Sequence, residues 1–303
     1  MRNVKIEYRR HFGPVPALVF FHGIVLLAAM FLGCSSVPKK PVEDFTNRNL
    51  AANQLNLANQ TASRGYYSDA LLILEEARRI TLGTDDPALR IKTSTTRANI
   101  LFSMGRHDEA FSEWDSAANE ADASNETVLA ALARVYSIRA RLVLFAAEDS
   151  GTDADVQDYK TQVSRIMGSA NDPVLGAAGN LTLGMADKQL KRWTDAENSV
   201  KKASEFHEKN FSLEDAAYDW FIIASIRSMA GNLDASLDAL KSAINFDRRA
   251  ENGFGLASSW QAMGDVYKKA NRDDDSRAAW RRAADIYRAM GHDDRADKLE
   301  AQL

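Results

Sequence analysis

Few residues of this chain have the types and spacing that a catalytic or metal site needs. Three histidines, His107, His207 and His292, lie beyond the first 33 residues, and none has a Cys, Asp or Glu at metal-ligand spacing. We interpret each as a solvated histidine at a turn or a helix end. The sequence contains no G-x-S-x-G, P-loop, H-E-x-x-H or G-x-G-x-x-G motif. We therefore predict that the protein is not an enzyme and holds neither a cofactor nor a metal.

Two runs of aspartate, at 273–275 and 293–294, resemble ligand clusters, but each stands where a helix is expected to begin. Carboxylates at such positions accept hydrogen bonds from free backbone N–H groups and interact favourably with the helix dipole. We predict that both runs cap helices.

Cys34 is the only cysteine of the chain, so it has no partner for an internal disulfide. It follows Gly33 and an apolar run at 24–32 (IVLLAAMFL), and the segment before that run is basic. This order resembles a bacterial lipoprotein signal. The resemblance implies that residues 1–33 are a signal peptide and that Cys34 receives a diacylglyceryl group. Two alternatives stay open: an uncleaved membrane anchor formed by 17–32, and an incidental thiol.

The residues after this signal indicate a place in the cell envelope. Residues 34–44 (CSSVPKKPVED) combine two prolines with mixed charge, which is typical of a short extended tether. Serine directly after the cysteine resembles signals sorted to the outer membrane, so we predict a membrane-anchored lipoprotein there that faces the periplasm. The remaining chain is mildly acidic without a basic stripe, which argues against a nucleic-acid partner.

The chain beyond residue 44 repeats a pattern in which a turn is followed by an alanine or serine that opens an apolar stripe. These turns begin at 65, 105, 191, 231 and 271, with gaps of 40, 86, 40 and 40 residues. The long gap equals two periods plus six residues, and 148–153 (EDSGTD) is the natural insertion. We predict six two-helix units over about 45–290, followed by a final helix that caps the stack.

The best-formed unit carries the resemblance to a known family. It has Trp260, Met263, Gly264 and Tyr267 on its first helix and Trp280 on its second. This pattern resembles the tetratricopeptide repeat, and the likeness covers about 250 residues. It implies an all-α solenoid over 45–303, in which small residues such as Gly264 lie where two helices cross closely and large residues fill the space beside them.

In tetratricopeptide proteins the first helix of each unit lines a concave face. Carried over onto this sequence, the resemblance implies a peptide groove that includes Asn59, Lys92, Asn99, Phe102, Tyr218, Phe221 and Lys268. Asn59 and Asn99 lie one period apart and should stack one repeat above the other. Their paired donors and acceptors could hold the backbone of an extended peptide, although both could equally be ordinary surface amides.

Two functions compete on these observations. The first is a non-enzymatic scaffold or adaptor lipoprotein, which binds other envelope proteins or peptides through its concave face and the membrane through the Cys34 lipid. The alternative is a ligand-binding accessory lipoprotein of a transport system, which would use an apolar cavity near Leu181, Tyr218 and Phe221.

Overall fold

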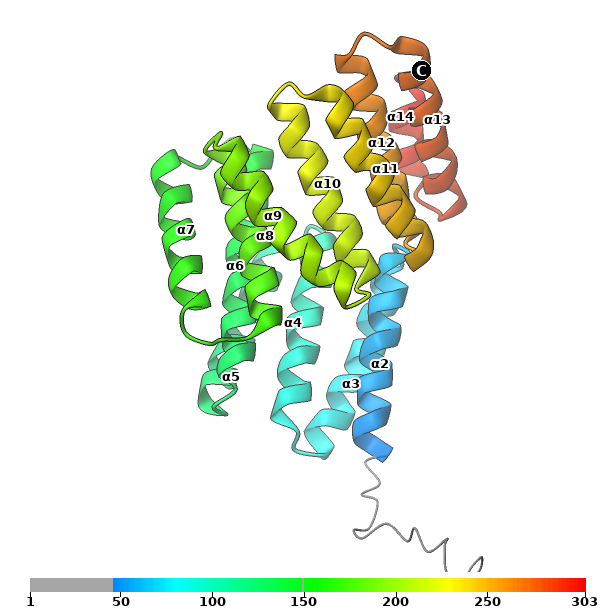
Figure 1. Ribbon diagram of the computed structural model, residues 1–303. Coiled ribbons are helices and arrows are strands. Elements are labelled where there is room, and N and C mark those ends of the chain that lie inside the picture. Colours follow the sequence, from blue (N-terminus) through cyan, green and yellow to red (C-terminus); the bar gives the residue numbers. More distant parts are fainter. Residues whose placement is uncertain (1–45, 149) are drawn as a thin grey trace, which may run out of the picture. The chain divides into compact units, whose positions relative to one another are not determined.

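The structure, a computed structural model, describes residues 46–148 and 150–303 (Figure 1). Cys34, the signal segment 1–33 and the tether 34–44 lie outside the described residues. Within them the chain forms thirteen helices and no strand. These are α2 (Thr46–Ser63), α3 (Tyr67–Gly83), α4 (Pro87–Ser103), α5 (His107–Ala123), α6 (Thr127–Glu148), α7 (Asp153–Met167), α8 (Pro173–Gln189), α9 (Trp193–Lys209), α10 (Leu213–Met229), α11 (Leu233–Ala250), α12 (Gly253–Lys269), α13 (Asp273–Ala289) and α14 (Asp293–Glu300). None of them is long and apolar enough to cross a membrane.

Successive helices pack as hairpins, and the predicted all-α solenoid is confirmed. The pairs α2–α3, α4–α5, α8–α9, α10–α11 and α12–α13 pack extensively, and each pair also packs against the next helix along the chain. The last helix, α14, covers the end of the stack by burying Ala296 and Leu299 against α13. No unit could bury its apolar face alone, so the stack is held together by contacts between neighbouring repeats.

The third unit departs from this scheme. α6 is the longest of the described helices, with 22 residues, and a loop separates it from the 15-residue α7. α7 packs more extensively against α8 than against α6, and α6 itself reaches α8. Gln189 on α8 donates a hydrogen bond across to the carbonyl of Leu142 on α6 (2.5 Å). The second helix of this unit packs only weakly on its first, which explains why the sequence pattern leaves the register of the third unit unassigned.

The turns repeat a single geometry. Each repeat turn holds one residue with positive φ, which is Gly65, Gly105 or Gly231 in three of them and Lys191 or Asn271 in the other two. The N–H of the following residue donates back to a carbonyl in the last turn of the helix, as Arg106 does to Leu101 (3.0 Å). This arrangement ends a helix sharply and satisfies its terminal carbonyls, which explains the regular period.

The aspartate runs stand at helix starts as predicted, but they do not cap. Neither α13 nor α14 has a side-chain cap hydrogen bond. Asp273 instead pairs with Lys268 (2.8 Å) and Asp275 with Arg272 (2.8 Å), while Asp274 pairs with Arg277. The basic neighbours three to five residues away offer each carboxylate a better partner than the backbone, and the dipole still favours a negative charge here.

The two ends of the stack meet. The rings of Tyr67 on α3 and Phe254 on α12 pack in a T-shaped contact, with centroids 6.1 Å apart. Gly65 packs so closely on His292, in the turn before α14, that a Cβ at Gly65 would lie 2.1 Å from its Nε2 atom. We call the contact of these four residues the closure contact. It brings α2 beside α12 (Figure 1), so the first repeat lies against the last.

Candidate binding cavity between the first and last repeats

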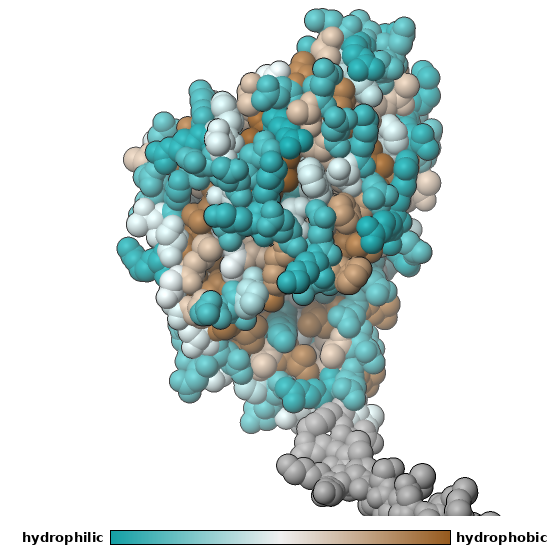
Figure 2. All heavy atoms as spheres, in the orientation of Figure 1, coloured by the Kyte–Doolittle hydropathy of each residue, from teal (hydrophilic) through white to brown (hydrophobic). Residues whose placement is uncertain are grey.

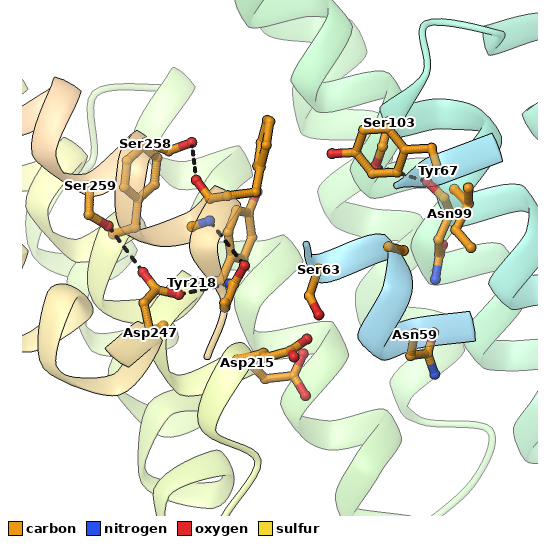
Figure 3. A pocket seen from close by; sticks show the side chains of 18 of the residues that line it. Asn59, Ser63, Tyr67, Asn99, Ser103, Asp215, Tyr218, Asp247, Ser258 and Ser259 are labelled. Carbon is orange, nitrogen blue, oxygen red and sulfur yellow. Dashed lines mark hydrogen bonds between the residues drawn. The ribbon is translucent and has the colours of Figure 1, made fainter. Parts of the chain in front are cut away.

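A cavity of about 590 Å³ lies where the closure contact joins the ends of the stack. We call it the central cavity. Its walls come mainly from the first helices of four repeats, α2, α4, α10 and α12, with Tyr67 and Asp247 added from α3 and α11. Figure 3 shows Asn59 and Ser63 on one side of this space and Asp215, Tyr218 and Asp247 on the other. Side chains that are far apart in the sequence therefore share one space of a size that suits a small ligand or an inserted side chain.

The central cavity collects four of the seven predicted groove residues. Asn59, Asn99, Tyr218 and Phe221 all line it. The first helices of the first two repeats therefore face that of the fifth repeat across a partly open cavity.

The other three predicted groove residues lie elsewhere. Phe102 packs between α4 and α5, with its ring centroid 5.9 Å from that of Trp114. Lys268 pairs with Asp273 at the exposed end of α12, and Lys92 is exposed on α4, outside the cavity lining. Leu181, named for the apolar alternative, is only 3% exposed and belongs to the core.

Asn59 and Asn99 are not equivalent, although they occupy the same repeat position. The Trp114 indole Nε1 donates a hydrogen bond to Asn99 Oδ1 (3.2 Å). The last repeat has the same arrangement, in which Trp280 Nε1 donates to Asp265 Oδ1 (2.9 Å). In the first repeat Leu74 stands where the indole would be, so no indole N–H reaches Asn59. The amide N–H groups of Asn99 are thus available to a ligand, while its oxygen is already bonded. In Asn59 both the N–H groups and the oxygen are available.

Three carboxyl groups that the sequence analysis missed face the central cavity. They belong to Glu214 and Asp215, on the first turn of α10, and to Asp247, near the end of α11. Asp247 is only 3% exposed; its Oδ1 accepts from the Asn252 amide (2.7 Å) and its Oδ2 from the Ser259 hydroxyl (3.3 Å). Burial raises the pKa of Asp247 to about 7. Partial burial raises the pKa of Glu214, and the nearby charge of Asp215 adds to this shift.

Aromatic rings complete the walls. Tyr218 and Phe221 stack on α10, with centroids 6.4 Å apart and planes 13° from parallel. Tyr67 and Phe254, joined in the closure contact, also line the cavity. The guanidinium of Arg295 lies over the Phe254 ring, 4.9 Å from its centroid, so that face is already covered by a cation. The lining thus combines aromatic faces with carboxylates.

The interpretation of His292 as a solvated histidine is wrong, because its Nε2 is buried against Gly65 in the closure contact. The same interpretation is wrong for His207. It is 9% exposed, and its Nδ1 lies 2.6 Å from Asp219 Oδ2 on α10. Burial opposes protonation of His207, but the hydrogen bond and charge of Asp219 outweigh it and raise the pKa of the imidazole. Burial raises the pKa of Asp219 to about 6. Asp247 and Ser259 stand exactly one 40-residue period later, so this junction between repeats holds a buried polar pair twice.

Other kinds of site are not evident in the part of the chain that the structure describes. No group of three or more His, Cys, Asp or Glu side chains there could hold a metal ion. Figure 2 shows one face of the molecule, which is mainly hydrophilic with apolar residues in scattered spots. The exposed large apolar side chains are spread over several helices, among them Leu72 on α3 and Met229 on α10. The central cavity is therefore the best-formed candidate among these residues.

The comparisons with known proteins establish the fold. No family model matches the chain, and no curated protein matches it. Among solved structures, a Rap protein complexed with competence and sporulation factor aligns at a TM-score of 0.52 and 14% identity, over 81% of this chain and 67% of that one. The Cut9-Hcn1 hetero-tetramer of APC/C aligns at 0.53 and 15% identity, over 92% of this chain and only 45% of that one. The neighbours are tetratricopeptide-repeat proteins, and the predicted resemblance is confirmed at the level of the fold.

Proposed function

We propose that this chain, which has the fold of tetratricopeptide-repeat proteins, is a non-enzymatic interaction scaffold of the bacterial cell envelope. The observation that carries the proposal is the central cavity, where the concave surfaces of four repeats converge. A peptide segment of a partner that enters it would touch α2, α4, α10 and α12 at once. Binding would then depend on the correct stacking of the repeats, as is usual for the extended binding surfaces of solenoids.

The polar lining suits a peptide backbone. Asn59 and Asn99 offer amide donors and acceptors, which match the alternating N–H and C=O groups of an extended chain. Tyr218 and Phe221 supply a flat apolar wall beside them. Aromatic side chains contribute much of the binding energy at protein interfaces because they bury large areas at a small cost in side-chain entropy.

Capture of a partner tests the scaffold function. The full-length protein in detergent would be used to pull down envelope proteins, once as wild type and once as Asn59→Ala with Tyr218→Ala. We expect the double variant to capture at least tenfold less partner than the wild type does. Lys92→Ala and Lys268→Ala, both outside the cavity, serve as matched controls and should capture it normally. If the lysine variants lose the partner and the cavity variant keeps it, the open groove predicted from the sequence is the binding surface instead.

The attachment to the membrane is proposed from the sequence. Gly33-Cys34 at the end of an apolar run supports a lipid on Cys34, and Ser35 supports sorting to the outer membrane, facing the periplasm. Cys34→Ala should leave the precursor uncleaved or release the protein from membranes, and labelled fatty acid should enter the wild type only. Ser36→Ala is the control. Equal fractionation of Cys34→Ala and wild type, with no label in either, would contradict the lipid anchor.

The alternative, a ligand-binding accessory lipoprotein of a transport system, draws on one observation. The central cavity, at about 590 Å³, lies within the size range of small-molecule sites and contains the stacked Tyr218–Phe221 pair. On this alternative, Phe221→Ala should abolish binding of a small ligand while the capture of protein partners is unaffected. The opposite result favours the scaffold.

A further inference from the structure

The charge of the central cavity has one sign. Glu214, Asp215 and Asp247 line it, and no Lys or Arg does. Among the ion pairs of the described residues, none involves these three carboxylates. At the neighbouring mouth, Arg64 pairs with Glu251 (3.6 Å), and the guanidinium of Arg249 lies over the Phe246 ring (5.3 Å). Glu214 and Asp215 also line this mouth, but neither carboxylate forms an ion pair with Arg64 or Arg249.

Asp247 is the most buried of the three carboxyl groups, and no cationic side chain of the described residues forms an ion pair with it. It is almost fully buried, and its two hydrogen bonds come from neutral groups, the Asn252 amide and the Ser259 hydroxyl. A carboxylate can accept about four hydrogen bonds, so Asp247 has acceptor capacity beyond these two. A buried carboxylate is costly when ionised unless an opposite charge or further donors reach it.

The aromatic wall also favours a cationic ligand. The Tyr218 and Phe221 rings stand on α10, the helix that also carries Glu214 and Asp215. The face of an aromatic ring attracts a cation within about 6 Å of its centroid. The chain already uses this interaction at the edge of the cavity, where Arg295 covers Phe254 (4.9 Å).

We propose that the central cavity binds a protonated amine or guanidinium group, held between the Tyr218–Phe221 wall and the carboxylates of Glu214, Asp215 and Asp247. This inference rests on the proposed function, since a peptide partner of the scaffold would supply the cation as a lysine or arginine side chain. A free small amine has the same chemistry and is the other source. An acidic ligand is repelled by all three carboxylates, and a purely apolar one leaves Asp247 desolvated without a counter-charge.

The test uses the full-length protein in detergent at low ionic strength and a set of capped pentapeptides. Each peptide has four glycines around a central lysine, arginine, norleucine or glutamate, and n-butylammonium represents the free amine. Isothermal titration should show that the lysine and arginine peptides bind at least tenfold more tightly than the norleucine and glutamate peptides. Norleucine has the same chain length as lysine without the charge, so the comparison isolates the cation.

Variants connect this preference to the cavity. Glu214→Gln with Asp215→Asn should weaken binding of the lysine peptide at least tenfold. The control is Glu205→Gln with Asp234→Asn, which removes the same charge from exposed positions outside the cavity and should leave the affinity unchanged. All four positions are exposed, and thermal melts of each variant verify that the fold is retained. Equal losses in both double variants would mean that only net charge matters, which overturns the site.

The remaining outcomes separate this inference from the proposed function. Binding of n-butylammonium without binding of any peptide supports the cation site and counts against the peptide scaffold. Binding of all four peptides with equal affinity, or a preference for glutamate, overturns the cation site and leaves the scaffold standing. If no probe binds, the cation site is overturned, and the partner capture described above decides the scaffold by itself.

Discussion

At the residue scale, burial changes the chemistry of side chains that look ordinary in the sequence. Asp247 lies near the end of α11 in a stretch rich in charged residues, where an exposed carboxylate would be expected. The next repeat instead covers it, and its only donors are neutral. Because desolvation penalises the charged form, its pKa rises from 3.8 to about 7.

This shift predicts how stability depends on pH. The folded state binds more protons than the unfolded chain between about pH 4 and pH 7, so the unfolding free energy decreases as the pH rises through that window. Asp247→Asn removes this titration, and its stability relative to wild type should increase from pH 4 to pH 8 by up to about 4 kcal/mol. Urea unfolding at several pH values measures the difference. Asp234→Asn, at an exposed position of the same helix, is the control and should give a curve almost parallel to wild type.

Replacing each of the two asparagines with alanine should change the stability of the protein by different amounts. Asn99→Ala leaves the indole N–H of Trp114, which is 2% exposed, without its acceptor and should cost about 1–2 kcal/mol of stability. Asn59→Ala, at an exposed position, should stay within about ±0.5 kcal/mol. Asn99→Asp restores an acceptor, as Asp265 provides for Trp280, and should recover most of the loss. Equal unfolding free energies for both alanine variants would show that the hydrogen bond contributes nothing.

At the element scale, the repeat depends on small residues where the two helices of a unit cross. Gly184, Ala224 and Gly264 lie one period apart, and all are buried. A Cβ at Gly264 would lie 2.3 Å from the Trp280 ring, which is fixed by its hydrogen bond to Asp265. The Ser276 hydroxyl donates to the Gly264 carbonyl (2.9 Å), as the Ser236 hydroxyl does to Ala224 (2.8 Å). The crossing is therefore close enough for a side chain of one helix to bond the backbone of the other.

Two alanine substitutions test this crossing against each other. Gly264→Ala should destabilise the protein by about 1–3 kcal/mol because the indole ring has to move, and Gly264→Leu should cost more. Gly176 also lies within a helix, but a Cβ there meets nothing within 4 Å. Gly176→Ala should therefore be neutral or stabilise by up to about 1 kcal/mol through helix propensity. Urea unfolding of both variants, run side by side, gives the comparison. If Gly264→Ala has the same unfolding free energy as wild type, the two helices do not cross closely at this position.

At the scale of the whole molecule, the closure contact decides what the concave surface becomes. Contacts between neighbouring repeats fix only a local rotation from one unit to the next. In this chain that rotation brings Tyr67 onto Phe254 and Gly65 onto His292, so the first and last repeats touch. The result is a central cavity in place of an open groove.

A double-mutant cycle between Tyr67 and Phe254 measures this closure. The two single changes to alanine and the double change should give a coupling energy of about 0.5–1.5 kcal/mol, the range for an aromatic pair in contact. The control pairs Tyr67 with Tyr159, which packs on Phe145 in the third repeat. That second cycle should be additive within about 0.5 kcal/mol. Additivity in both cycles would mean that the ends of the stack do not touch in solution.

The repeating architecture can be predicted from the sequence. Turn residues, small residues such as Ala224 and Gly264, and large ones such as Trp280 act within one unit or between adjacent units. Their effect is local, and it recurs every 40 residues, so it can be recognised in one dimension. The resemblance to the tetratricopeptide repeat implied a groove that includes Asn59, Asn99, Tyr218 and Phe221, and these four residues line the central cavity.

Which of these residues share a site depends on how the repeats stack in three dimensions. Phe102 packs between helices because its ring finds Trp114, and His207 is buried because Asp219 of the next repeat covers it. Glu214 and Asp247 face the same space as Asn59 because the stack turns far enough for its ends to meet. Small rotations between repeats accumulate over the whole chain, and no local pattern of residues encodes their sum.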